Sequence, residues 1–162
     1  MRSLNLMALS LAAVAVAAAG DDVAKKDREN LQGTWKLVAG RDDLGKTFPA
    51  DLLEKGVRLV VMGDRMKFMP EGGDDEMEFQ IVDPNKKPKH IDFFVVRNGK
   101  KTTRPVPGIY EIDGNRLRLS MNDRAGTVKG KDAKDKGGKA TEPARPTSFD
   151  QGGPSFVFER QK

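Results

Sequence analysis

Apolar and polar residues alternate with a period of two through most of the chain after Gly33. Such alternation is typical of β-strands that bury one face, and here it occurs in short segments separated by turn residues. The pairs Gly63-Asp64 and Asn98-Gly99 favour tight turns between antiparallel neighbours. No helical crossover separates the segments, so a parallel sheet is excluded. The pattern predicts an all-β fold of about eight antiparallel strands, either an up-and-down barrel or a related sandwich, and closure into a barrel removes exposed edges.

The expected elements follow from this pattern and from the helix signals beside it. A short helix is expected within residues 20–32, where Gly33 ends it. The proline at the start of residues 49–55 favours one or two helical turns there. Strand pairing is expected to extend into residues 101–104. The main strands are expected at residues 35–39, 57–62, 65–69, 77–81, 91–96, 108–112, 116–119 and 156–160.

The residues expected to face the barrel interior are all uncharged. An eight-stranded barrel either fills its interior with side chains or holds one small ligand, and the pattern leaves both outcomes open. If the interior is hollow, the residues expected to contact an apolar ligand are Met66, Phe68, Met77, Phe79, Phe93, Tyr110 and Leu119. The other inward positions are Val57, Leu59, Val61, Ile81, Ile91, Val95, Ile112, Leu117, Met121, Phe156 and Phe158.

Residues 1–19 have the features of a secretory signal peptide. Arg2 precedes an apolar run of Leu, Met, Ala and Val that ends in alanines before Gly20. The run is short for a bilayer span, and small residues at its end are typical of a signal cleavage site. We therefore expect an exported protein, periplasmic or extracellular, with no stable membrane insertion after cleavage; a retained N-terminal anchor is the alternative. Residues 33–162 are expected to form one β-barrel domain.

Residue types that carry chemistry are scarce. The chain has no cysteine, which excludes disulfides, thiol nucleophiles and thiolate metal sites. His90 is the only histidine, so we expect a surface role for it and no transition-metal site. The acidic clusters 42–43 and 74–76 lack the alternating spacing of a calcium loop. No nucleophile elbow or phosphate-binding glycine loop is present, so we expect neither a cofactor nor enzyme activity; a hydrolase would need polar side chains clustered in the barrel mouth.

A basic segment covers residues 124–146, where seven lysine and arginine residues outnumber three acidic ones. It supplies most of the net charge of +5. Its lysines, glycines and aspartates, with almost no apolar residue among them, predict a disordered loop. The segment has no aromatic side chain on which bases could stack, so no nucleic acid partner is expected. Solubility is the simplest role for this charge, and an anionic polymer or an envelope protein is the alternative partner.

Four motifs follow one another along the chain: Leu31-Gln32-Gly33-Thr34-Trp35, Asp83-Pro84 with Pro88-Lys89 and Ile91-Asp92, Gly108-Ile109-Tyr110-Glu111 with Asp113-Gly114, and Arg145-Pro146-Thr147 with Phe149. In this order the chain, from about Leu31 to Arg160, resembles an uncharacterised family of exported bacterial lipocalin-like domains. The resemblance implies a small lipocalin-like barrel and carries no established activity, substrate or catalytic residue. The long Lys/Gly-rich insert before Arg145 departs from the family pattern.

Trp35, the only tryptophan, follows Gly33 at the start of the first strand. By comparison with lipocalins, the resemblance implies that the indole closes one end of the barrel and that Arg160, on the last strand, stacks on it. The alternative is a tryptophan that stacks on a ligand in the open mouth. We expect Gly33, Trp35 and Arg160 to form the barrel closure.

The expected function is that of a non-catalytic carrier or sensor for a small apolar ligand. The alternative is an interaction module in the cell envelope, with a packed and ligand-free barrel that contacts a protein or an anionic polymer. Residues 40–56 and 124–146 would then form the contact surface. The space inside the barrel distinguishes the two functions.

Overall fold

The computed structural model describes residues 14–69, 76–122, 143–150 and 153–162. Residues 1–13 of the predicted signal and residues 123–142 of the predicted basic loop lie outside this part of the chain. The described elements are α1 (Val14–Leu31), β1 (Gly33–Arg41), α2 (Ala50–Glu54), β2 (Arg58–Met62), β3 (Arg65–Met69), β4 (Glu76–Asp83), β5 (Lys89–Arg97), β6 (Lys100–Lys101), β7 (Val106–Asp113), β8 (Arg116–Met121) and β9 (Ser155–Arg160).

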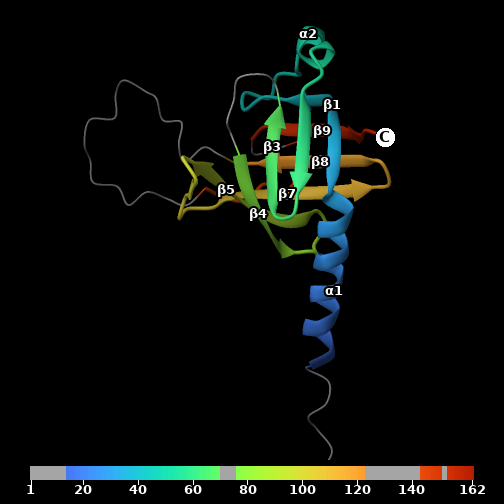
Figure 1. The fold of residues 1–162 in the computed structure, drawn as a ribbon, viewed down its shortest axis with the longest axis vertical. Helices are drawn as coiled ribbons and strands as arrows, with labels where there is room; N and C mark the ends of the chain where they lie inside the picture. Colours follow the sequence, from blue (N-terminus) through green and yellow to red (C-terminus); the bar gives the residue numbers. More distant parts are fainter. Residues whose placement is uncertain (1–13, 70–75, 123–142, 151–152) are drawn as a thin grey trace, which may run out of the picture.

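The strands form a closed antiparallel barrel (Figure 1). From β1 to β5 and from β7 to β9, each strand pairs with the next one along the chain, and β5 also pairs with β7 beside the short β6. The pairing of β1 with β9 completes the circle. The predicted eight-stranded up-and-down barrel is confirmed, with β6 as one additional strand.

The two helices differ in how closely they follow the prediction. α2 forms where it was expected, directly after Pro49. α1 begins at Val14, earlier than the helix expected within residues 20–32, and runs unbroken past Gly20. Its first residues are valine and alanine, and alanine has the highest helix propensity. Among the described residues, no helix is long and apolar enough to cross a bilayer.

The barrel has two different ends, and Figure 1 shows α1 and α2 at opposite ones. At the closed end, α1 leads into β1, β2 turns into β3 and β7 turns into β8. At the mouth, α2 lies in the connection from β1 to β2, and strands β3, β5 and β8 end. These two ends give the residues on each strand different surroundings.

The segment of residues 143–150, which we call the strap, crosses the outer wall of the barrel. Arg145 donates to the carbonyl oxygens of Ile91 on β5 and Gly108 on β7, both at 2.7 Å. It also pairs with the Asp92 carboxylate at 2.5 Å. The disordered loop was expected to extend to residue 146, but the strap fixes the last of those residues to the wall. The physical reason is that Arg145 satisfies two strand carbonyls and one carboxylate.

Candidate functional site

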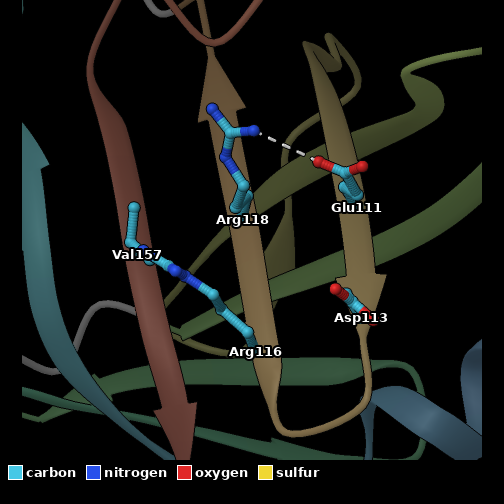
Figure 2. Close-up of a pocket in the computed structure, with 5 residues that line it drawn as sticks. All are labelled: Glu111, Asp113, Arg116, Arg118 and Val157. Atoms are coloured by element: carbon cyan, nitrogen blue, oxygen red, sulfur yellow. Dashed lines mark hydrogen bonds and ion pairs between the residues drawn. The ribbon is translucent and has the colours of Figure 1, made fainter.

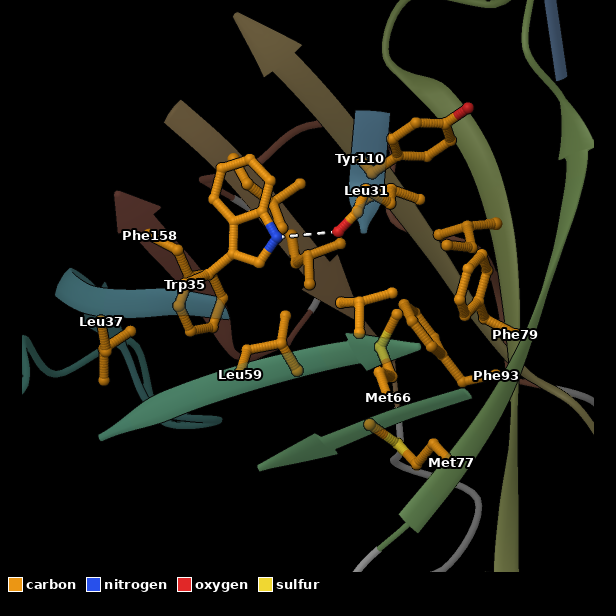
Figure 3. Close-up of a cluster of buried hydrophobic side chains, with 14 of the residues drawn as sticks. Leu31, Trp35, Leu37, Leu59, Met66, Met77, Phe79, Phe93, Tyr110 and Phe158 are labelled. Atoms are coloured by element: carbon orange, nitrogen blue, oxygen red, sulfur yellow. Dashed lines mark hydrogen bonds between the residues drawn. The ribbon is translucent and has the colours of Figure 1, made fainter. Parts of the chain in front are cut away.

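The closed end brings together the three residues predicted to form the barrel closure. Trp35 is fully buried and donates from Nε1 to the carbonyl oxygen of Leu31 at 2.8 Å (Figure 3). The guanidinium carbon of Arg160 lies 4.1 Å from the centre of the indole ring, a cation–π geometry. Gly33 has a φ of +110°, and a Cβ at this position would lie 3.3 Å from Nη1 of Arg160. Glycine therefore leaves room for the stacked arginine.

Arg160 also joins the last strand to the helix. Its guanidinium donates to the carbonyl oxygens of Gln32, at 2.6 Å, and of Asn30. Carbonyl groups at the end of a helix lack partners within the helix and carry partial negative charge, so a guanidinium stabilises them. Leu31, the last residue of α1, is fully buried in the barrel core. The last turn of α1 thus plugs the closed end.

A buried charged cluster lies beside this plug. Asp27 on α1 accepts hydrogen bonds from Nζ of Lys89, at 2.8 and 2.6 Å, and from the hydroxyl of Tyr110, at 2.6 Å. The Asp27 side chain is 8% exposed, and the Lys89 side chain is 30% exposed. Strand alternation predicts Tyr110 inside the barrel but does not by itself reveal the other two. The sequence does contain a signal for their position. Lys89 lies two residues before Ile91, on the same face of the strand, and Asp27 lies one helical turn before Leu31.

The Tyr110 hydroxyl makes the stability of the barrel depend on pH in the alkaline range. Burial first, then the hydrogen bond to Asp27 and the charge of that carboxylate, raise the pKa of Tyr110 above its ordinary value of 10.0. The folded protein therefore keeps the phenolic proton at pH values where the unfolded chain loses it. The stability from this group is present below a pH of about 10 and is lost as the pH rises further.

We expect the free energy of unfolding to fall above pH 10 by up to about 1.4 kcal/mol per pH unit because of this one group. Tyr110→Phe removes the titrating hydroxyl, so the stability of the variant should fall less steeply over the same range. Urea denaturation of both proteins from about pH 8 to about pH 11 measures the two slopes. Equal slopes would contradict this role of the buried hydroxyl.

The barrel interior above the plug is filled with side chains (Figure 3). Of the residues predicted to contact a ligand, Met66 is 1% exposed and Phe79 2%, while Phe93, Tyr110 and Leu119 are 0% exposed. At these values the five side chains are almost completely shielded from water. The structure brings them together as packed core, and their contact with a ligand stays a prediction.

The mouth retains partly exposed apolar surface. Phe68 and Met77, the other two predicted ligand contacts, lie at the mouth ends of β3 and β4; Phe68 is half-buried and Met77 is 9% exposed. The ring centre of Phe156 lies 5.6 Å from that of Phe68 and 5.7 Å from that of Phe48. We call Phe48, Phe68 and Phe156 the mouth cluster. Other half-buried apolar residues that pack against the core near this end are Leu52, Leu53, Val106 and Met121.

Three hollows formed by described residues lie on the outside of the barrel. One, of about 230 Å³, borders the strap. Another, of about 260 Å³, lies where β1 and β9 meet the end of the strap. None of the three is lined by a predicted ligand contact. The largest of them, of about 370 Å³, is lined by Glu111, Asp113, Arg116, Arg118 and Val157 (Figure 2).

His90 lies near the closed end, at the start of β5. Its pKa is lowered by burial, then by the nearby charge of Arg145. In the part of the chain that the structure describes, no three His, Cys, Asp or Glu side chains are placed to hold a metal ion. Among the described residues, His90 is therefore not part of a group that could hold a metal ion.

Comparisons of the chain with protein-family models, with curated proteins and with solved structures find no match. The family resemblance therefore stays a prediction from the motifs.

Proposed function

We propose that this barrel is a non-catalytic carrier or sensor that binds a small apolar ligand at its mouth. The observation that carries the proposal is the contrast between the two ends. At the closed end Leu31 and Trp35 are fully buried, whereas the aromatic rings of the mouth cluster are only half-buried. Neighbouring, partly exposed apolar groups on a rigid scaffold are typical of a ligand-binding surface.

The filled interior sets the depth at which the ligand lies. Phe158 is fully buried, and its ring centre lies 6.1 Å from those of both Phe68 and Phe156. Phe158 therefore forms the base of the mouth cluster, and a ligand contacts the rings above it. Covering these rings removes apolar surface from water, which favours binding. We also propose that the protein is exported. This part of the proposal rests on the signal-like sequence of residues 1–19.

We expect the wild-type protein to bind anilinonaphthalene sulfonate, a fluorescent dye with an apolar ring system and one sulfonate group, and to release it to competing fatty acids or phospholipids. Phe68→Ala and Phe156→Ala each remove one ring of the mouth cluster, so each should weaken dye binding about tenfold or more. Fluorescence titration measures the dye affinity, and native mass spectrometry detects the bound lipid.

Met62→Ala is the matched control, because Met62 is 73% exposed on the outer wall of β2 and lies away from the mouth. Its dye affinity should equal that of the wild type. Circular dichroism verifies that each variant is folded. Unchanged dye affinity in both phenylalanine variants would rule out the mouth as the binding site.

A second candidate function is that of an interaction module with a ligand-free barrel. The packed interior favours it, because a module of this kind needs no cavity. The partner would be an envelope protein or an anionic polymer, as the basic segment suggests. The same lipid panel separates the two candidates, since a wild-type protein that binds neither dye nor lipid supports the module.

A further inference from the structure

A groove crosses the outer wall of the barrel, and at one end its lining includes Phe156 of the mouth cluster. The hollows of about 370 and 260 Å³ share Arg118 and Val157 in their linings, so they lie side by side on the wall. The larger hollow lies over β7, β8 and β9, where Figure 2 shows its lining side chains. The smaller one continues over β9 and β1 to Phe149 in the strap. We call the two together the wall groove.

Short side chains form the floor of the wall groove. Val157 on β9 is the register partner of Ala39 on β1 and of Arg118 on β8, and Arg118 is in turn the partner of Glu111 on β7. This row crosses four neighbouring strands, a distance of about 14 Å at the usual strand spacing. Two strands contribute small apolar side chains and two contribute long charged ones. The groove is therefore apolar at its base and polar along its sides.

Two of the arginines in the groove are held in place by partners. Arg118 pairs with Glu111 at 3.3 Å, and its guanidinium carbon lies 4.2 Å from the ring centre of Phe149. Arg41 forms an ion pair with Asp150. These pairs are electrically neutral, yet each retains donors and acceptors that point to solvent. Because the partners restrict the side chains, a ligand loses less entropy in ordering them.

Arg116 decides the charge of the ligand. No carboxylate forms an ion pair with it among the described residues, although Asp113 on β7 and Glu159 on β9 are its register partners on either side. An anion bound to Arg116 would thus face two carboxylates, and a cation bound to those carboxylates would face Arg116. Both arrangements are disfavoured by like-charge repulsion. The row selects a neutral ligand.

Hydroxyl groups can form hydrogen bonds with both kinds of charged side chain in this row. Guanidinium groups only donate hydrogen bonds and carboxylates only accept them, whereas a hydroxyl group does both. A sugar can therefore accept from Arg116 and donate to Asp113 at the same time. Its C–H face is apolar and fits the floor formed by Val157 and Ala39. We propose that the wall groove binds a short neutral oligosaccharide.

The test is an NMR titration of the ¹⁵N-labelled protein with neutral cello- and chito-oligosaccharides. The largest changes in amide chemical shift should occur at the residues of β7, β8 and β9 whose side chains line the groove. The affinity should change by less than about twofold between low and high salt, because a neutral ligand is not screened. Arg116→Ala and Asp113→Ala should each weaken the affinity about tenfold, since each removes a charge-assisted hydrogen bond.

Arg58→Ala is the matched control, because Arg58 is exposed on the outer wall of β2, away from the groove. It should bind the oligosaccharides as the wild type does. Two further arms use an acidic oligogalacturonide and an acidic peptide. The proposal is overturned by the absence of shifts with every neutral sugar, by binding of the acidic ligands alone, or by unchanged affinity in Arg116→Ala. Because the substituted residues Arg116 and Asp113 are not part of the mouth cluster, none of these results decides the dye experiment.

Discussion

Trp35→Ala is expected to lower the free energy of unfolding by about 3–5 kcal/mol, the range for deleting a large buried aromatic side chain. Trp35 is fully buried at the closed end, so its removal leaves a cavity beneath the helix plug. The variant also loses the hydrogen bond from Nε1 to the Leu31 carbonyl and the ring on which Arg160 stacks. These losses affect one contact region, where strand, helix and final strand meet.

Urea denaturation followed by far-UV circular dichroism measures this effect, because Trp35 is the sole tryptophan and its fluorescence disappears in the variant. Trp35→Phe serves as the control. It keeps an aromatic ring but lacks the N–H donor, so it should lose clearly less stability than the alanine variant. The folded fraction of either variant should still bind dye at the mouth. A Trp35→Ala protein with normal stability and no dye binding would favour the ligand-stacking alternative.

Asp27→Leu is expected to cost about 2–4 kcal/mol, because it leaves the Lys89 charge and the Tyr110 hydroxyl without their acceptor. This value lies below the usual cost for a fully buried pair, since the Lys89 side chain is 30% exposed and water screens part of its charge. The same change removes the polar contacts that hold α1 against β5 and β7. Hydrogen exchange should therefore become faster in the last turns of α1.

Two matched variants define what the Asp27 result means. Asp27→Leu/Lys89→Met replaces both charges with apolar groups and should recover a substantial part of the lost stability. Glu76→Ala removes the partner of Arg65 from a pair whose side chains are 36% and 56% exposed, and it should cost less than about 1 kcal/mol. If the double variant is no more stable than Asp27→Leu, the unpaired Lys89 charge is not the cause of the loss.

Local sequence signals were sufficient to predict most of the barrel. Alternation with a period of two records which face of each strand is buried, and it needs no knowledge of distant residues. Turn chemistry acts locally too: Asn98 and Gly99 both have positive φ, as a tight hairpin turn requires. Closure followed because eight antiparallel strands leave edges that pairing β1 with β9 removes.

Other features depend on segments that meet only in the folded molecule. Asp27 and Lys89 are charged, and composition alone gives no reason to bury either until α1 docks on the barrel. Ile109 lies on the outer face of β7 and is nevertheless fully buried, as expected where the strap crosses the wall. The sequence does not predict this burial, because the strap follows a basic, glycine-rich segment that is expected to be disordered as far as residue 146.

The sequence by itself determined the strand pattern, the barrel class and the residues available for closure at Gly33, Trp35 and Arg160. The tertiary structure alone decided that the closed half is packed, that the aromatic rings at the mouth stay half-buried, and that Arg116 lies between two carboxylates. The physical reason is the distance along the chain between the residues that set each property. Backbone turns and side-chain alternation are properties of neighbouring residues, whereas burial, cavity volume and charge pairing depend on strands brought together from distant parts of the chain.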